Sequence, residues 1–207
     1  MAFFSAASKA DFQQQLQTAL AQHVDPKILP QLSLFAEQFF GIVALPELTE
    51  RRMSDLVGST LASWRLLERF DPAKPEVQVF NPDFEKHGWQ STHSVVEVLH
   101  PDMPFLVDSV RMELTRRGYS IHTLQTSVLQ VRRGADGSLL ELLPKDERAA
   151  DSHAESLIFV EIDRCASPTA LRELEQSLLG VLADVRQVVG DFAAMKGKAV
   201  ELQGRLE

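Results

Sequence analysis

Apolar residues recur at helical spacing from residue 8 to residue 70. Ser8 with Asp11 starts one helix, Asp25-Pro26 starts a second, and a third ends before Asp71-Pro72, because capping residues and prolines mark helix ends. The apolar stripes contain Phe12, Leu16, Ala19 and Leu20, then Ile28, Leu32, Phe35, Phe39 and Val43, then Met53, Leu56, Val57, Thr60, Leu61, Trp64 and Leu67. The linker DPAKPE follows, so residues 1–72 are predicted to form a helical N-terminal subdomain.

The spacing becomes strand-like from residue 76, where β-branched residues are frequent. The predicted strands are 76–80, 92–100, 119–133, 139–142 and 156–162, with the turn sequence GADG between the third and the fourth. A helix is predicted from Pro104 to Arg117, with Gly118 as its stop. Its core stripe contains Leu106, Val107, Val110 and Leu114.

The predicted order, β-α-β-hairpin-β-α, is typical of the ferredoxin-like split βαβ arrangement without its last strand. We therefore predict an α+β fold, with an antiparallel sheet and helices on one face of it, over residues 73–166. Residues 76–80 precede this unit and have no other partner. They are predicted to fill the edge that the missing strand leaves open.

Residues 167–207 are predicted to form one long helix after Ser167-Pro168. Its apolar residues alternate in steps of three and four: Leu171, Leu174, Leu178, Val181, Val185, Val188, Phe192, Met195, Ala199, Leu202 and Leu206. A stripe of this kind has to be covered by other apolar groups. The helix would complete the sheet module or pack on the N-terminal helices, and an intermolecular coiled coil or a contact with later domains are the alternatives.

Composition narrows the function classes. The net charge of -8 and the lack of a long basic run disfavour nucleic acid as a partner. No stretch approaches the ~18 apolar residues of a membrane span, and the start of the chain lacks a basic export signal. Cys165 is the one cysteine, which excludes an internal disulfide and fits a reducing compartment. A cytoplasmic protein without membrane partners is expected.

Candidate catalytic and metal-binding groups are scattered. His87, His93 and His100, with Asp102 and Asp108, fall on a loop, a strand and a turn, so we expect no metal site. The ten glycines form no G-x-G-x-x-G motif, so no NAD cradle is expected in this segment. No nucleophile elbow surrounds a serine. An independent enzyme is therefore disfavoured.

The stretch HPDMPFLVDS, residues 100–109, lies at the predicted turn from strand to helix. Asp102 is predicted to cap the helix, Pro104 to occupy its first position, and Asp108 to add favourable charge near its start. Trp89 is a further large apolar residue, and Phe105 and Met112 form a second apolar stripe seven residues apart. This stripe would either close the core against the N-terminal helices or contact another module or subunit.

The motifs FNP, GWQSTH and DMPFLVDSV together resemble the N-terminal region of the large bacterial NAD-dependent glutamate dehydrogenases, most strongly over residues 76–133. The resemblance implies an ACT-like regulatory module ahead of the catalytic domain. It also implies that the parent enzyme, and not this segment, uses NAD. Its partners would be downstream domains of the same polypeptide and other subunits of a homo-oligomer.

ACT modules that bind amino acids usually carry D-x-P-G between the first strand and the first helix, where glycine lets a ligand approach backbone N–H groups. Here Phe105 takes that place and its ring is predicted to cover the pocket floor. A free amino acid effector and a free-standing amino-acid sensor remain alternatives to a scaffold. The candidate effector or inter-module contacts are His100, Asp102, Met103, Phe105, Asp108, Met112 and Trp89.

Overall fold

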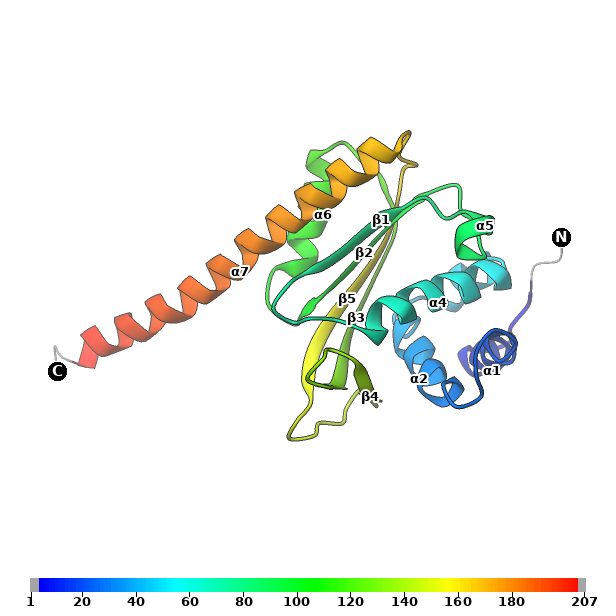
Figure 1. Cartoon of the computed structure of the whole chain (residues 1–207), viewed down its shortest axis with the longest axis horizontal. Coiled ribbons are helices and arrows are strands. Elements are labelled where there is room, and N and C mark those ends of the chain that lie inside the picture. Colours follow the sequence, from blue (N-terminus) through cyan, green and yellow to red (C-terminus); the bar gives the residue numbers. More distant parts are fainter. Residues whose placement is uncertain (1–3, 205–207) are drawn as a thin grey trace.

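The structure, a computed structural model, describes the backbone of residues 4–204 and the side chains of residues 4–192. This part of the chain contains a five-stranded antiparallel sheet between two layers of helices (Figure 1). The strands are β1 (Glu76–Phe80), β2 (Ser94–Pro101), β3 (Ile121–Arg133), β4 (Leu139–Leu143) and β5 (His153–Ile162), in the order β1-β2-β5-β3-β4.

The helices are α1 (Lys9–Leu20), α2 (Leu29–Phe39), α3 (Leu45–Thr49), α4 (Met53–Glu68), α5 (Phe84–His87), α6 (Leu106–Arg116) and α7 (Pro168–Gly204). α1, α2 and α4 occupy the places of the three helices predicted from apolar spacing, but α2 begins at Leu29 and not at the predicted start, Asp25-Pro26. The short α3 and α5 were not predicted, because five or four residues are too few to show a helical stripe. The predicted cap of the first helix is also present, since the Ser8 hydroxyl accepts a hydrogen bond from the Asp11 N–H.

The edge position predicted for residues 76–80 is confirmed. β1 pairs antiparallel with β2, with Glu76 opposite Leu99 and Phe80 opposite Val95. β2 and β3 both pair with β5, as in the split βαβ arrangement, so β1 stands where that arrangement would place its last strand. The hairpin of β3 and β4 extends the other side of the sheet.

One face of the sheet packs against α6 and α7. Its cluster joins Val96 and Val98 of β2 to the α6 residues Leu106, Val110 and Leu114 and to the α7 residues Leu174, Leu178 and Leu182. Burying each of these leucines stabilises the fold by about 1.5–3 kcal/mol. The long helix therefore completes the sheet module, and the expectation that it packs on the N-terminal helices is wrong for its described side chains.

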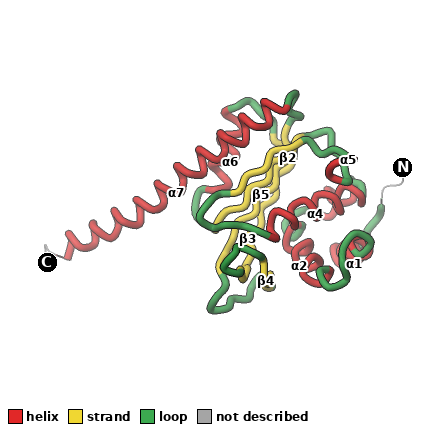
Figure 2. Tube along the Cα trace, in the orientation of Figure 1, coloured by secondary structure: helices red, strands yellow, loops and turns green. Residues whose placement is uncertain are grey.

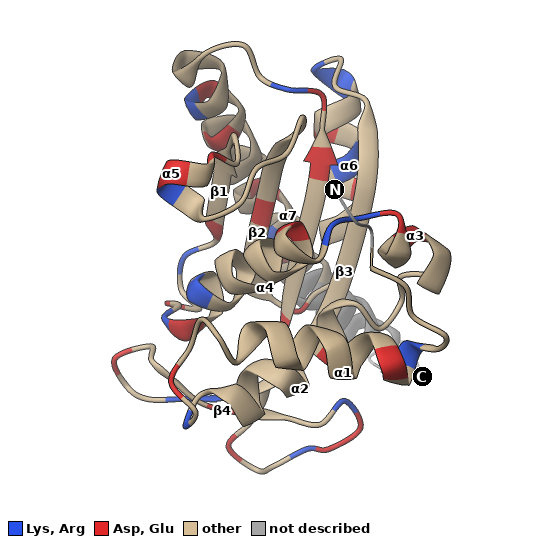
Figure 3. Cartoon of the chain, turned by 90° about the vertical axis from the view of Figure 1, so that its right-hand side faces the viewer, with Lys and Arg blue, Asp and Glu red and all other residues tan. Residues whose placement is uncertain are grey.

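The other face of the sheet packs against α1, α2 and α4, which lie across the strands in Figure 3. Phe39 of α2 meets Phe159 of β5 edge to face, with ring centroids 5.6 Å apart. The expectation of helices on one face only is therefore wrong. The run SVVEV of β2 is buried on both sides, because its valines alternate between the two faces and each face needs a cover. Figure 2 shows the strands as one layer between the two helical layers.

α7 leaves the body of the molecule after its first half (Figure 1). Val185 is still buried, whereas Val188 and Phe192 are 61% and 63% exposed. The predicted stripe residues Met195, Ala199, Leu202 and Leu206 lie outside the residues whose side chains the structure describes. Within the described residues, none of the helices is long and apolar enough to cross a membrane.

Candidate functional site

The loop that carries the GWQSTH motif, residues 88–93, is placed by a short helix and a close helix contact. The Asp83 carboxylate accepts a hydrogen bond from the Glu85 N–H at 2.8 Å and so caps α5. α5 ends at Gly88, whose φ of 77° suits glycine, and the next residue, Trp89, enters the core with an exposed fraction of 2%. Gly58 of α4 makes room for it, since a Cβ there would lie 2.2 Å from Trp89 Cγ. Trp89 thus closes the core against the N-terminal helices and does not form a surface for another module or subunit.

Hydrogen bonds tie this loop to the end of β5. Arg164 donates to the Ser91 carbonyl oxygen at 2.8 Å. The Ser94 hydroxyl accepts from the Cys165 N–H at 2.7 Å and donates to Asn81 Oδ1 at 2.5 Å. Asn81, the polar residue of the FNP motif, in turn donates to the Cys165 carbonyl oxygen at 3.1 Å. Asn81, Ser91 and Ser94 thus hold the region that carries both motifs against the end of β5, more than 70 residues later in the chain.

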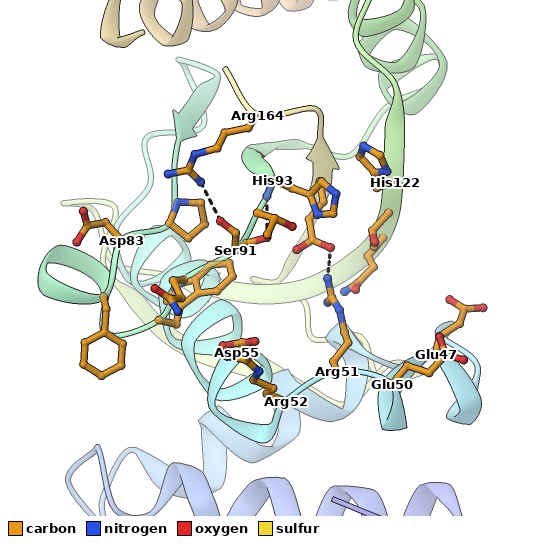
Figure 4. A pocket seen from close by; sticks show the side chains of 18 of the residues that line it. Glu47, Glu50, Arg51, Arg52, Asp55, Asp83, Ser91, His93, His122 and Arg164 are labelled. Carbon is orange, nitrogen blue, oxygen red and sulfur yellow. Dashed lines mark hydrogen bonds and ion pairs between the residues drawn. The ribbon is translucent and has the colours of Figure 1, made fainter. Parts of the chain in front are cut away.

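A cleft of about 1140 Å³ opens between these segments (Figure 4). Its walls come from α3, the start of α4, residues 82–93, the start of β3 and the end of β5, and we call it the GWQSTH cleft. Arg51 reaches across the cleft to form an ion pair with Glu161, which is buried at the end of β5. The Arg51 side chain is about three-quarters buried, so water screens this pair less than a pair on the open surface.

Two histidines stand beside each other on the β3 side of the cleft. The rings of His93 and His122 have centroids 4.0 Å apart. His122 Nε2 lies 2.8 Å from Asp163 Oδ1, and Asp163 also accepts a hydrogen bond from the Ser120 N–H at 3.0 Å. These hydrogen bonds, that from the Ser120 N–H first, lower the pKa of Asp163 to about 2. The aspartate is therefore ionised at neutral pH and accepts the hydrogen bonds of the Ser120 N–H and the His122 ring.

Polar groups at the base of the cleft lack partners. Both amide atoms of Gln125 and the indole Nε1 of Trp89 are buried without a hydrogen-bond partner among the described residues. Asp55, at the start of α4, is partly buried, and burial raises the pKa of its carboxyl group. The cleft therefore offers buried donors and acceptors together with a carboxylate that lacks full solvation. Such groups suit the binding of a polar molecule.

The candidate residues near the start of α6 lie at the opposite end of the sheet, because β2 runs from the cleft to that end. Of the seven candidates, all of them described, Trp89 lines the cleft and the other six do not. His100 is fully buried, with Nδ1 2.7 Å from the Pro101 carbonyl oxygen, and burial lowers its pKa. Met103 is half-buried beside the α6 cluster, and Asp108 forms an exposed ion pair with Arg111 at 3.2 Å.

The predicted cap of α6 is wrong. The Asp102 carboxylate accepts a hydrogen bond from the Ser156 hydroxyl of β5 at 2.6 Å, so it joins the turn to the sheet. The helix begins at Leu106, and its N-cap position is held by Phe105 without a side-chain cap. Pro104 precedes the helix. Asp102 therefore fastens this stretch to the neighbouring strand and does not cap the helix.

The predicted position of the Phe105 ring is also wrong. The ring covers no pocket floor, because Phe105 is 65% exposed. Its backbone has a φ of 72°, in the left-handed region that glycine adopts without strain. This explains why a glycine suits the corresponding position of a D-x-P-G turn. Met112, seven residues after Phe105 in the same apolar stripe, is 68% exposed. This second stripe therefore faces outward and does not close the core.

The described residues contain no cluster of metal ligands, and the turns that lead into α6 and α7 contain no glycine. No three His, Cys, Asp or Glu side chains in that part of the chain come close enough to hold a metal ion. A dinucleotide needs a glycine-rich turn between a strand and a helix. The turns that lead into α6 and α7 contain Asp102 to Phe105 and Asp163 to Ser167, neither with a glycine, and Phe105 places a side chain on the backbone that a pyrophosphate would approach.

Sequence reasoning missed most of the groups that form the cleft, namely Arg51, Asp55, Gln125, Glu161 and Arg164. Two signals were available. The GWQSTH motif marked one wall of the cleft, and Gln125 and Glu161 are polar residues on strands that carry apolar core residues. A buried polar residue on a strand indicates either a polar contact or a ligand.

Comparison with known proteins identifies the family. The family model "Glutamate dehydrogenase, ACT1 domain" matches residues 35–178. Proteins named NAD-specific glutamate dehydrogenase are 68% identical over 202 residues in Pseudomonas aeruginosa and 45% identical over 192 residues in Halomonas elongata, covering 98% and 93% of this chain. The chain spans 12% of the length of each of these two relatives. No solved structure matches it significantly. The chain belongs to the family of the glutamate dehydrogenase ACT1 domain.

Proposed function

We propose that this chain is a non-catalytic regulatory and scaffolding module of a large NAD-dependent glutamate dehydrogenase. In the full enzyme, downstream domains of the same polypeptide would convert L-glutamate to 2-oxoglutarate with NAD. One observation carries this proposal: the ACT1-domain match covers most of the chain, while the chain spans 12% of the relatives named for that activity. The rest of such an enzyme has ample length for the catalytic domains.

The exposed groups on α6 support a role in assembly. Phe105 and Met112 present large apolar side chains to solvent, although they follow directly on a well-packed core. Exposed apolar groups of this kind are typical of surfaces that contact another module. Downstream domains of the same polypeptide and other subunits of a homo-oligomer are the proposed partners, in the cytoplasm.

The proposal is tested by titrating the 207-residue chain with NAD in a calorimeter. We expect no binding in the micromolar range, because no glycine-rich turn is available for the pyrophosphate. The full-length parent enzyme serves as the positive control. Micromolar binding of NAD to the 207-residue chain would contradict a non-catalytic role.

A second measurement addresses regulation. In the parent enzyme, Phe105→Ser together with Met112→Ser should alter subunit assembly or the dependence of rate on effectors, while the pair leaves the folded module intact because both side chains are exposed. Sedimentation and steady-state kinetics report the two effects. An enzyme unchanged in both respects would argue against this face as the assembly surface.

A further inference from the structure

The unpartnered groups of the GWQSTH cleft point to a missing partner. Gln125 and Trp89 are each 2% exposed, and Gln125 lacks a partner for both its amide oxygen and its amide nitrogen. Leaving a buried polar group unpaired costs about 1–3 kcal/mol, so native proteins usually satisfy such groups. Both residues line the cleft. A molecule bound in the cleft is a direct way to satisfy them.

The charge of the cleft indicates which kind of molecule fits. Its lining contains six carboxylates against three guanidinium groups: Glu47, Glu50, Asp55, Asp83, Glu85 and Glu161 against Arg51, Arg52 and Arg164. Arg51 is already paired with Glu161, and Arg164 is bonded to the Ser91 carbonyl oxygen. The excess of negative charge disfavours an anion and favours a ligand with a positive group.

Asp55 is the carboxylate best placed to receive that group. It extends from the first turn of α4 toward the space between Arg51 and residues 82–93 (Figure 4). Among the described residues, Asp55 accepts a hydrogen bond from the Ser54 hydroxyl at 3.3 Å, and Arg51 and Arg52 act on its charge through space without a direct ion pair. A cation beside it would offset the cost of its partial burial.

We propose that the GWQSTH cleft binds a small organic ammonium compound of the size of a free amino acid. Its ammonium group lies at Asp55, and its remaining polar groups bond the Gln125 amide and the Trp89 indole N–H. The site is separate from the turn at residues 100–106, which stands at the other end of the sheet. It does not depend on the role of the chain in a larger enzyme.

Binding there would join parts of the fold that are far apart in sequence. Asp55 belongs to the N-terminal helices, Trp89 to the motif loop and Gln125 to β3. A ligand that contacts all three stabilises the folded chain, because it binds the native arrangement and not the unfolded chain. The ligand would therefore raise the melting temperature of the chain as well as shift the resonances around the cleft.

The experiment titrates the 207-residue chain with L-lysine and, separately, with glutarate, while backbone amide and indole N–H chemical shifts are recorded. Glutarate is a small organic acid of similar size that carries two carboxylates and lacks an ammonium group. We expect saturable shifts with L-lysine at residues 88–93, at Gln125 and at the Trp89 indole N–H, together with a higher melting temperature. Glutarate should produce neither.

Two variants and one control separate binding from folding. Asp55→Asn should weaken L-lysine binding by about tenfold or more through loss of a charged contact. Gln125→Met should weaken it as well while leaving the chain folded, because it removes an unpaired buried amide at similar volume. Asp108→Asn, an exposed change at the other end of the sheet, should bind as the unaltered chain does.

Several outcomes would overturn the proposal. One is the absence of saturable shifts at millimolar L-lysine. Others are equal responses to glutarate, shifts centred on residues 100–106, and unchanged affinity in Asp55→Asn. Melting curves of each variant without ligand verify that the variants are folded.

Discussion

Phe105 adopts a positive φ, 72°, and no other non-glycine residue in the described part of the chain does so. The conformation costs a residue with a Cβ about 1–2 kcal/mol. Packing does not compensate, because the ring is largely exposed. Strain that is retained without a packing benefit often marks a position kept for a contact outside the fold.

Replacing Phe105 should therefore stabilise the chain. Phe105→Gly is expected to raise the free energy of unfolding by about 0.5–1 kcal/mol, since the relief of strain exceeds the extra entropy of glycine in the unfolded state. Phe105→Ala keeps the Cβ and should give no such gain. Urea unfolding of both variants measures the difference, and a loss of stability in Phe105→Gly would mean that the ring packs against the fold.

Glu97 is a carboxyl group buried between β2 and α4. It accepts a hydrogen bond from the Ser63 hydroxyl at 2.5 Å, and burial raises its pKa to about 7. Its ordinary pKa is 4.5, so between pH 4.5 and pH 7 the folded chain holds a proton that the unfolded chain has lost. This group therefore makes the chain less stable as the pH rises through that window.

The Glu97→Gln variant should lose this dependence. We expect the free energy of unfolding of Glu97→Gln, minus that of the unaltered chain, to increase by about 3 kcal/mol from pH 4.5 to pH 8. At low pH this difference should become small. Glu37→Gln, on the exposed side of α2, is the control. The lowered pKa of buried His100 makes the chain more stable as the pH rises, which opposes the effect of Glu97. Both the variant and the unaltered chain contain His100, so the difference between their free energies of unfolding isolates the effect of Glu97. A constant difference across pH would contradict the assignment.

At the scale of elements, α4 and the motif loop approach as closely as a glycine allows. Trp89 lies against Gly58 and belongs to the core between the N-terminal helices and the sheet, so a shift of either residue would disturb that core. On α7, in contrast, a Cβ added at Gly180 would meet no atom within 4 Å. The two glycines form a matched pair within one chain.

Alanine at these two glycines should have opposite effects. Gly58→Ala is expected to destabilise the chain by about 1–3 kcal/mol, because the new methyl group overlaps the Trp89 side chain. Gly180→Ala should stabilise it by up to about 1 kcal/mol through helix propensity. Thermal unfolding and Trp fluorescence report the two effects. A neutral Gly58→Ala would show that the motif loop can shift away from α4.

Local patterns predicted much of the fold, but not the contacts between distant segments. Apolar spacing located α1, α2, α4 and the five strands, and the unpaired segment 76–80 indicated its own place at the sheet edge. The cap assigned to Asp102 failed because Ser156, 54 residues away, offers it a hydrogen bond that sequence spacing does not show. The cleft depends on pairs such as Arg51 and Glu161, which are 110 residues apart.

At the scale of the whole molecule, the described residues 4–72 form one layer over a core that they share with the sheet. Their aromatic residues Phe35 and Phe39 belong to the same cluster as Leu99 and Phe159 of the sheet. The N-terminal helices therefore share one hydrophobic core with β2 and β5. The boundary at residue 72 marks a change of element type in a continuous core.

Removing residues 1–72 should consequently expose the sheet. Residues 73–207, produced alone, lack the helices that cover one face of the sheet. We expect this segment to bind a dye specific for apolar surface and to unfold without a sharp cooperative transition. Adding residues 1–72 as a separate chain should reverse the dye binding. A soluble, cooperatively folded segment 73–207 without dye binding would establish two independent domains.

The edge position of β1 has a mechanical consequence. Because a strand from before the split βαβ unit fills the last place in the sheet, the chain after β5 has no strand to form and continues as the 37-residue helix α7. That helix is held by its first half and extends beyond the body (Figure 1). At 1.5 Å per residue, a rotation of about 5° at Val185 moves Gly204 by about 2.5 Å. A small tilt of the sheet would therefore be amplified into a larger displacement at the far end of α7.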